Sequence, residues 1–436
     1  MSKFSKFIPD FRSLFFGSSA YKAAIFTRAL NAFITRGTVF LGLVLYLQIK
    51  GNNFTSIALL TTVYFAPQLL FSLFAGRLSD TLKDRRFFIT LGFIGSGVIF
   101  IFYPLIGWIG YALVLRFIQG IFESAIRPLT QAIAANEGGS DTRGAKVSFF
   151  KMAVFAGSSL GPMSVGYLIQ FTGYRFLFQG TAVAMIIAGI LAWFFIDPYR
   201  EDSKADEGTF RELFSYEQLK EILLHKSIFS PPEGPDPCPF SPQKIKKEAS
   251  SLFLFIAWVR RTAFSMFTTF IPIYLVTNLG ISTGMVGTLE GMRRFMIVGA
   301  IILSGTLADN WGRKPLLVLA SFSFLGPIIY AIFPSLSGVW VAAFILGLTI
   351  GLFNPTAITY MADLSPPEKK GTYLGFLVST SGVSRVLGPI LGGILADLIG
   401  LTSVFLTAGL IISLTLPLSL LLRETSPCQE AQEVGW

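Results

Sequence analysis

Gly76-Arg-Leu-Ser-Asp80 in the first half of the chain returns as Gly305-Thr-Leu-Ala-Asp309 in the second half. Each stretch closes an apolar run and opens a short charged loop. The partners lie 229 residues apart in this motif and 227 residues apart in four later pairs, which are Gly120 with Gly347, Pro128 with Pro355, Gly161 with Gly388 and Pro162 with Pro389. Matched spacing of this kind indicates two copies of one module. It predicts a duplicated membrane bundle that transports a solute between its halves.

The bulk composition agrees with a membrane protein. Of the 436 residues, 52% are hydrophobic and only 14% are charged, and the mean hydropathy is +0.63. Apolar runs near the 20 residues that cross a bilayer recur along the chain, without the short alternating segments of a membrane barrel. We therefore expect an all-α integral membrane protein with twelve transmembrane helices in two pseudo-symmetric six-helix bundles. The predicted helices are 21–48, 54–79, 87–106, 110–134, 145–170, 175–196, 251–277, 283–308, 315–333, 338–361, 371–397 and 401–422.

The polar segments divide the chain into five parts. An amphipathic N-terminus is expected to lie on the inner leaflet, and the central linker is predicted to hold a short amphipathic helix over 210–228, followed by a proline-rich stretch. Such a linker is either a mere connector or a flexible tether between two bundles that rock. The predicted parts are the N-terminus 1–20, the N-terminal bundle 21–196, the linker 197–250, the C-terminal bundle 251–422 and the tail 423–436.

The positions of the cations indicate the topology. The net charge is +10, but Lys and Arg gather on alternate loops, beside predicted helices 1, 2, 4, 8 and 10. This bias predicts a multi-pass protein of the cell membrane with both termini in the cytoplasm, embedded in the lipid bilayer and not bound to nucleic acid.

Few side chains are available for metal or catalytic chemistry. Cys238 and Cys428 both fall in predicted cytoplasmic segments, and His225 is the single histidine of the sequence. These residues form no zinc spacing, catalytic triad or disulfide framework, and the chain has no nucleotide-binding Gly-x-x-x-x-Gly-Lys-Ser/Thr loop. We expect no enzyme activity, no metal and no cofactor.

The loop motif resembles that of the major facilitator superfamily, and the resemblance covers residues 21–422. The second copy carries the whole motif, while the first has Lys83 where a glycine is usual and Asp84 where a basic residue is usual. An aspartate at a helix end can stabilise the positive N-terminus of a neighbouring helix by about 0.3 to 1 kcal/mol. The motif is therefore interpreted either as a conformational latch or as a topology anchor. The gating candidates are Gly76, Asp80, Arg85, Gly305, Asp309, Arg313 and Lys314.

Two further elements are similar to motifs of this superfamily. One is Arg116-x-x-Gln119-Gly120, and the other resembles the motif of its antiporter branches. Glycines four apart allow helices to pack closely, and a proline permits a bend. The second element is either a packing device or a hinge that favours export. Its residues are Gly157, Gly161 and Pro162, with Gly388 and Pro389 in the second half.

Charges present in only one half are the candidates for handling cargo and coupling. A charged group centred in a membrane helix costs about 2.5 to 3.5 kcal/mol on insertion scales, so it is expected to face water or a partner. The spacing predicts Glu123 near Arg127, and Glu290 near Arg294. Glu123 is interpreted either as a paired structural acid or as a proton carrier. The candidate set is Arg36, Arg116, Glu123, Arg127, Glu290 and Arg385.

Taken with the resemblance, these features indicate a monomeric secondary transporter that works by alternating access. Its partners are expected to be a small-molecule substrate and protons or another coupling ion. The leading hypothesis is proton-coupled efflux of small organic or amphiphilic compounds. One alternative is uptake or exchange of an organic anion through Arg36, Arg116 and Arg385, because internal cations outnumber internal acids. The other is a transport-inactive membrane sensor of the same fold.

Overall fold

The computed structural model describes residues 18–82, 84–137, 143–196, 242–366 and 369–425. Within these ranges, the side chains of 73–78, 80–82, 143–145, 242–248, 306 and 309 also fall outside the description. The predicted N-terminal amphipathic segment and the predicted linker helix over 210–228 lie outside the described residues.

The first half of the chain forms one helical bundle. Its elements are α2 (Ser19–Ile34), η1 (Thr35–Leu43), α3 (Val44–Ile49), α4 (Phe54–Leu82), α5 (Arg85–Phe102), η2 (Tyr103–Leu105), α6 (Ile109–Glu123), α7 (Ile126–Asn136) and α8 (Arg143–Phe195). The long α8 contains the predicted fifth and sixth spans. Gly173, with φ of +79°, breaks the helical geometry between them, a conformation that glycine adopts without steric cost.

The second half forms the other bundle. Its elements are α11 (Pro242–Thr268), α12 (Ile271–Thr277), α13 (Thr283–Trp311), α14 (Arg313–Ser321), η4 (Phe322–Phe324), α15 (Leu325–Ile332), α16 (Leu336–Leu364), α17 (Lys370–Ile399), α18 (Leu401–Ser413) and α19 (Thr415–Leu420). The helix α11 begins before the expected residue 251. Pro242 is its first residue, a position where the missing N–H of proline costs nothing.

Within the described ranges, nine helices are long and apolar enough to cross a membrane. One of the nine is α8, which holds two predicted spans in one continuous assignment. The nine do not include α11 and α13, which also correspond to predicted spans but carry charged side chains such as Arg260 and Glu290. The all-helical membrane fold is thereby confirmed.

Four prolines account for helix interruptions that the predicted spans did not include. A proline inside a helix removes one hydrogen bond, and its ring clashes with the carbonyl group four residues earlier. Each break lies at or beside that earlier residue. The prolines and the elements they separate are Pro128 between α6 and α7, Pro272 between α11 and α12, Pro327 between α14 and α15, and Pro417 between α18 and α19.

The first predicted span also departs from a regular α-helix. Its middle, Thr35–Leu43, is a π-helix, a rare geometry that is frequent at functional sites. Arg36 lies in this segment. Beside it, Gly37 packs so closely that an added Cβ would lie 2.6 Å from the Gly161 carbonyl oxygen on α8.

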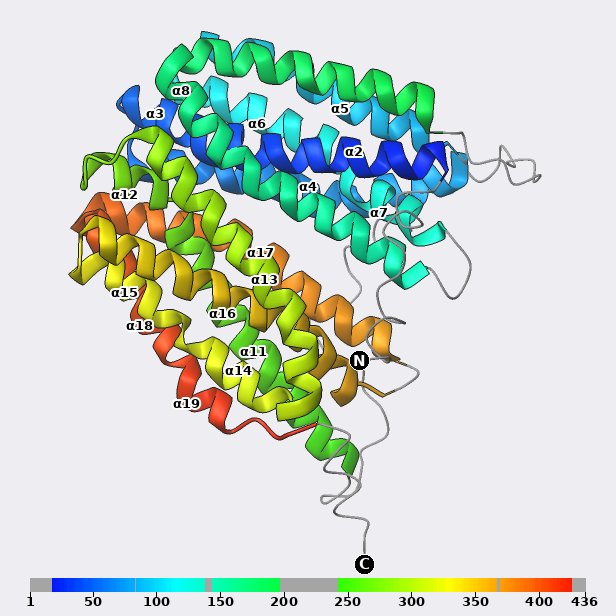
Figure 1. Ribbon diagram of the computed structural model, residues 1–436, viewed down its shortest axis with the longest axis vertical. Coiled ribbons are helices and arrows are strands. Elements are labelled where there is room, and N and C mark those ends of the chain that lie inside the picture. Colours follow the sequence, from blue (N-terminus) through cyan, green and yellow to red (C-terminus); the bar gives the residue numbers. More distant parts are fainter. Residues whose placement is uncertain (1–17, 83, 138–142, 197–241, 367–368, 426–436) are drawn as a thin grey trace, which may run out of the picture.

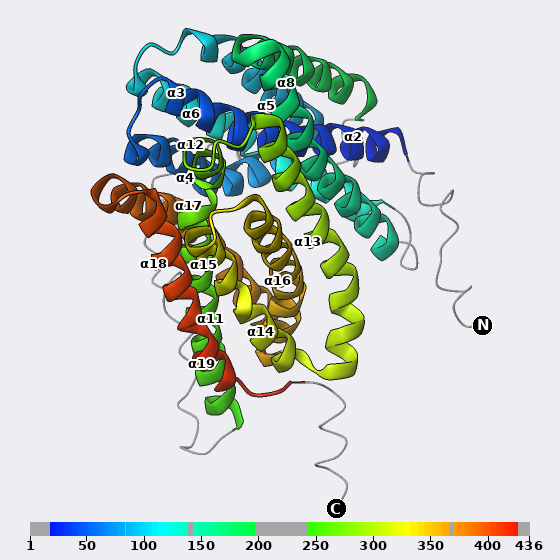
Figure 2. The same cartoon turned by 60° about the vertical axis from the view of Figure 1, so that its left-hand side comes forward.

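The two bundles lie side by side, with α2–α8 above and α11–α19 below in Figure 1. The main contacts between them are those of α8 with α13 and of α4 with α17, and α3 also touches α12. The ribbons converge near α3 and α12 and diverge toward the end where α2 begins and α19 ends (Figures 1 and 2). We call these ends the closed end and the terminal end.

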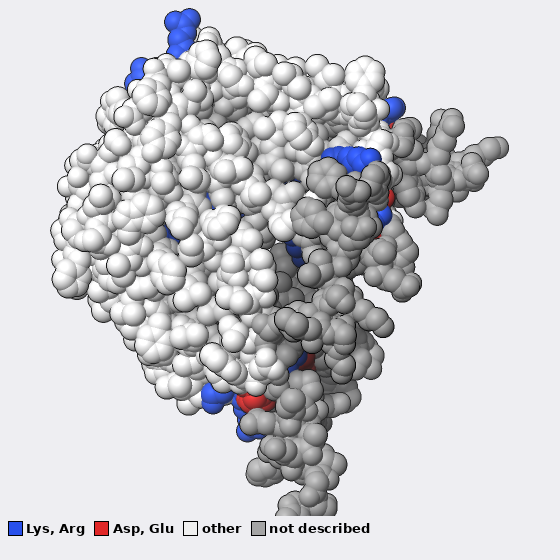
Figure 3. All heavy atoms as spheres, in the orientation of Figure 1, with Lys and Arg blue, Asp and Glu red and all other residues white. Residues whose placement is uncertain are grey.

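The outward surface suits a lipid environment. Large apolar side chains are exposed around the bundles, including Phe171 at 78% and Leu398 at 77%. Figure 3 shows a broad uncharged face, with Lys and Arg atoms mainly toward its edges. Because lipid tails are apolar, such a surface is stable in a bilayer and would aggregate in water.

Candidate functional site

A buried polar cluster surrounds Glu123 at the end of α6. Tyr64 on α4 donates its hydroxyl to Glu123 Oε2 at 2.5 Å, and Gln119 Nε2 donates to Oε1 at 2.8 Å. Gln119 accepts in turn from Arg116 Nη1 at 2.7 Å and from the Tyr103 hydroxyl. The Glu123 carboxylate, 5% exposed, is therefore held by neutral donors.

A second arm of this cluster leads to α2. Asn31 Nδ2 lies 3.5 Å from Glu123 Oε2, and Arg28 Nη1 donates to Asn31 Oδ1 at 2.7 Å. Two arginines, Arg28 and Arg116, thus each reach Glu123 through one amide side chain. This arrangement stabilises a carboxylate without closing an ion pair on it.

The predicted pairing of Glu123 with Arg127 is absent from the ion pairs of the described residues. The reason is the break at Ser124 and Ala125 that accompanies Pro128, because the i,i+4 spacing brings side chains together only in a continuous helix. Arg127 is exposed, while Glu123 is buried.

The Glu123 cluster also includes Arg116. This side chain is 2% exposed, and its guanidinium carbon lies 3.9 Å from the centre of the Tyr64 ring. Both of its partners, Gln119 and Tyr64, belong to the first bundle, and its hydrogen bond holds Gln119 in place. Direct contact with an anionic cargo, which the sequence suggested for Arg116, has no support in this position.

On α13, Glu290 forms a buried ion pair. Its Oε2 lies 2.5 Å from Arg293 Nη2 and 3.8 Å from Arg294 Nη2. The predicted contact with Arg294 is present, but the shorter contact is with Arg293, three residues away. Residues three and four apart share a face of a continuous helix, so Glu290 reaches both arginines.

Arg36 and Arg385 come from opposite bundles and stack on neighbouring rings. The Arg36 guanidinium lies 4.7 Å from the Phe40 ring centre, and that of Arg385 lies 5.2 Å from the Phe65 ring centre. The two rings are 6.0 Å apart. The repulsive charges around Arg36 include Arg294, Arg385 and Arg127. The structure thus brings four arginines from both bundles together.

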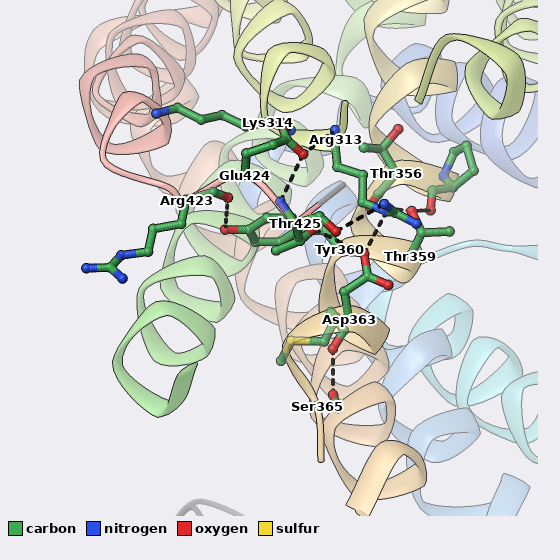
Figure 4. A network of polar contacts seen from close by, with 12 residues as sticks. Arg313, Lys314, Thr356, Thr359, Tyr360, Asp363, Ser365, Arg423, Glu424 and Thr425 are labelled. Carbon is green, nitrogen blue, oxygen red and sulfur yellow. Dashed lines mark hydrogen bonds and ion pairs between the residues drawn. The ribbon is translucent and has the colours of Figure 1, made fainter. Parts of the chain in front are cut away.

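The gating motif of the second half is built into a polar network at the terminal end (Figure 4). Arg313 Nε lies 2.7 Å from Asp363 Oδ2 on α16. The Glu424 carboxylate accepts from the backbone N–H groups of Arg313 and Lys314 at 2.8 and 3.0 Å. Gly312, with φ of +92°, forms the turn. A carboxylate at the N-terminus of α14 stabilises the unpaired N–H groups of that helix.

The proposed latch residues of the motif are only partly visible. The side chains of Asp80 and Asp309, and Gly76 with them, lie outside the described side chains. Gly305 is exposed, with no heavy atom within 4 Å of an added Cβ. Arg85 begins α5, whose N-terminus is capped by Asp84. The choice between latch and topology anchor therefore stays a prediction.

The glycines of the antiporter-like element make close helix contacts. An added Cβ on Gly157 or Gly161 would lie 2.2 Å from a carbonyl oxygen of α2. Toward the second bundle, an added Cβ on Gly287 of α13 would lie 2.2 Å from the Pro162 carbonyl oxygen. The second half repeats the first arrangement, since Gly388 of α17 packs against Thr262 of α11. Pro389, beside it, lies inside α17 without a break.

One polar contact between the bundles was not predicted. Asp397, near the end of α17, accepts from the backbone N–H groups of Phe54 and Thr55 at 2.9 and 2.8 Å. It therefore caps the N-terminus of α4 from the opposite bundle, at the closed end. An acid near the end of a span was the one available signal, and sequence cannot tell which helix such an acid caps.

Comparison with protein families agrees with the geometry. A family model described as Major Facilitator Superfamily matches residues 24–247 and 253–434. The Klebsiella pneumoniae (strain 342) multidrug resistance protein MdtG is 24% identical over 400 residues, which cover 88% of this chain and 89% of the relative. The Lactococcus lactis multi-drug resistance efflux pump PmrA homolog is 32% identical over 177 residues, covering 37% and 42%.

Solved structures share the fold. A single-site mutant of the nucleoside transporter NupG superimposes with a TM-score of 0.72 at 11% identity, covering 93% of this chain and all of that one. A bacterial homologue of the human lysosomal transporter Spinster, inward-facing and occupied, gives 0.71 at 14%, covering 95% and 97%. At these identities the likeness shows the fold alone.

Proposed function

Because the chain belongs to the Major Facilitator Superfamily and is a multi-pass secondary transporter, we propose that it exports small organic solutes in exchange for protons. The names of the relatives, a multidrug resistance protein and an efflux pump, support export. The positively charged loops support a terminal end that lies in the cytoplasm. In the conformation of Figure 1, the two bundles would then diverge toward the cytoplasm.

The setting of Glu123 carries the proposal of proton coupling. It is a buried carboxylate held by Tyr64, Gln119 and Asn31, all of which are neutral. A directly paired arginine would strongly favour the ionised form of an acid. Among the described residues, no arginine forms an ion pair with Glu123 within 4.0 Å. Glu290, with Arg293 at 2.5 Å, is the contrasting structural acid.

The Tyr64 hydroxyl allows both charge states of Glu123 to be satisfied. When Glu123 is ionised, Tyr64 donates to it, as in the present geometry. When Glu123 is protonated, the same hydroxyl can rotate and accept the acid proton, because a phenol is both donor and acceptor. A protonated Glu123 therefore keeps a hydrogen-bond partner inside the buried cluster.

The rocking of two bundles would carry this proton across the membrane. Arg127 follows the break after α6 and is exposed, and its charge acts on Arg36 and on Arg385 of the opposite bundle. In a second conformation, a change at Ser124 and Ala125 can bring Arg127 toward Glu123 and expel the proton. Coupling follows if the loaded and unloaded forms favour different conformations.

The test is flux in proteoliposomes under an imposed pH gradient, with a panel of fluorescent organic compounds. Glu123→Gln keeps the size of the side chain and one accepting oxygen but cannot release a proton. We expect it to abolish pH-driven accumulation while exchange of cargo across the membrane, with cargo on both sides, continues. Glu137→Gln is a matched control that makes the same substitution at a partly exposed acid after α7 and should retain the pH response. Unchanged pH-driven flux in Glu123→Gln would show that another group carries the proton.

A further inference from the structure

Four arginines from the two bundles form a group that, among the described residues, makes no ion pair with Glu123 in this structure. They are Arg36 on the π-helical segment η1, Arg127 on α7, Arg294 on α13 and Arg385 on α17. We infer that this group, called here the arginine site, binds the acidic group of an aromatic organic anion, a carboxylate or sulfonate on a flat ring. That this anion is the exported cargo rests on the proposed function.

Ring contacts show that the site joins the two bundles. Arg36 lies 4.7 Å from the Phe40 ring centre, Phe40 lies 6.0 Å from Phe65, and Arg385 lies 5.2 Å from Phe65. Next to Arg385, the Val386 carbonyl accepts from Thr62 Oγ1 on α4 at 2.7 Å. A chain of direct contacts therefore connects η1, α4 and α17.

Glycine packing places the α13 arginines at the same level. An added Cβ on Gly37 would lie 2.6 Å from the Gly161 carbonyl oxygen, and one on Gly291 would lie 2.5 Å from the Ser159 carbonyl oxygen. Both glycines contact the same stretch of α8. Arg36 directly precedes Gly37 in the sequence, and Glu290 directly precedes Gly291. Consistently, Arg294 repels the charge of Arg36, and Arg36 and Glu290 attract each other.

The charges at this level do not balance. Glu290 is an acid beside these arginines. Its Oε2 lies 2.5 Å from Arg293, which is not one of the four, and 3.8 Å from Arg294. Among the described residues, Arg36, Arg127 and Arg385 take part in no ion pair within 4.0 Å. Like charges that repel one another in a partly dry space favour a bound anion and disfavour a cation.

Accessibility separates these arginines from the structural ones. Arg116 and Arg260 are each 2% exposed. Arg127 is exposed, and Arg36, Arg294 and Arg385 are partly exposed. A solute entering between the bundles can therefore reach the arginine site without unfolding either bundle.

The rings explain why a flat apolar body is expected beside the acidic group. Phe40 and Phe65 are both partly exposed, and each already offers one ring face to a guanidinium. An aromatic anion can ion-pair with the guanidinium groups and pack against the rings, whereas chloride would use the charges alone.

Binding to the purified full-length protein in detergent tests the inference without transport. The probes are 2-naphthoate, its neutral isostere 2-naphthamide, the cationic 2-naphthylmethylammonium and sodium chloride, each titrated by isothermal calorimetry. We expect naphthoate to bind at least about tenfold more tightly than the amide or the ammonium, a ratio set by one charge-assisted contact. Arg385→Gln should lose that preference, and Phe65→Ala should weaken the binding of all three naphthyl probes. Arg175→Gln, which removes an exposed arginine beyond the Gly173 turn, should bind as the wild type does.

Equal affinity for the acid, amide and ammonium would overturn the inference, as would displacement of naphthoate by chloride at equal concentration. So would an Arg385→Gln protein that folds, by its unfolding temperature, and keeps the preference. The outcomes are separable from those of the proposed function. Selective naphthoate binding without pH-driven flux would support the arginine site and contradict proton-coupled export. Export driven by pH of only neutral or cationic dyes would support proton-coupled export and contradict the arginine site as the cargo site.

Discussion

At the scale of single residues, the environment of each charge decides its role more than its presence in the sequence does. Glu123 and Glu290 both precede an arginine by four residues. Glu290 lies in a continuous helix and pairs with Arg293, while Glu123 ends a helix and binds neutral donors. The sequence could therefore supply both acids as candidates, but it could not tell which acid pairs with an arginine and which binds neutral donors.

The reason lies in contacts between distant residues. Tyr64 and Asn31 come from α4 and α2, and neither belongs to a motif that marks it as a partner of Glu123. Arg116 was predicted from sequence as a charge without a counterpart in the other half, yet it contacts Gln119 and Tyr64 inside one bundle. Comparing the two halves identifies unusual residues. It does not tell which way their side chains point.

A surface residue gives a prediction about pH. Burial by itself raises the pKa of Glu137, but hydrogen bonds from Ser18 and Lys146 lower it and prevail. The folded state then binds fewer protons than the unfolded state near and below the ordinary value of 4.5, so this stabilisation is present above that pH and is lost below it. Glu137→Gln should lower the unfolding temperature at neutral pH and match the wild type in acid.

Thermal unfolding of the detergent-solubilised protein across a pH series measures this difference. Ser18→Ala removes the hydroxyl bond to Glu137 and also the cap on the Tyr21 N–H, so part of its deficit should persist into acid. A Glu137→Gln deficit that stays constant into acid would mean that the carboxylate charge is not what stabilises the α2 end.

At the scale of elements, the positions of most spans follow from hydrophobic run length, but their interruptions needed a second rule. Pro128, Pro272, Pro327 and Pro417 each coincide with a break near the fourth residue before them. Pro67, Pro162, Pro355 and Pro389 lie inside helices without such a break. Proline in the sequence thus marks candidate breaks, and packing against neighbouring helices decides between a break and a continuous helix. The π-helical segment around Arg36 had no sequence signal.

The cap that Asp397 places on α4 gives a prediction at this scale. Asp397 joins the bundles, so its loss should weaken the closed end by about 1 kcal/mol and raise the population open at that end by about fivefold. Asp397→Ala is compared with Asp84→Ala. Asp84 caps α5, with a 3.0 Å bond to the Phe87 N–H, but it acts within one bundle. Spin labels at Thr172 and Asn278, exposed on opposite bundles near the closed end, measure the population.

Asp84→Ala should lower the unfolding temperature and leave the label distances unchanged. If both variants shift the distances equally, or if neither does, the Asp397 contact is an ordinary helix cap without control over opening.

At the scale of the whole molecule, the repeat predicted two related bundles, and the structure places them with α4 against α17 and α8 against α13. The fold followed from sequence because duplication, composition and the loop motif all pointed to one architecture. The central site followed only in part. Arg36 and Arg385 were candidates from sequence, but the ring pair between them depends on how two bundles face each other, which run length and spacing do not encode.

If the two ends of the molecule open alternately, the distances between the bundles at those ends must change in opposite directions. Double electron–electron resonance would use labels at Thr172 and Asn278 for the closed end, and at Lys151 and Ile302 for the terminal end, after replacing Cys238 and Cys428 with serine. We expect two populations, and between them one distance lengthens as the other shortens. Glu123→Gln should change the ratio of the two populations and the response of that ratio to pH. A single distance for both pairs under all conditions, or two distances that lengthen together, would contradict alternate opening.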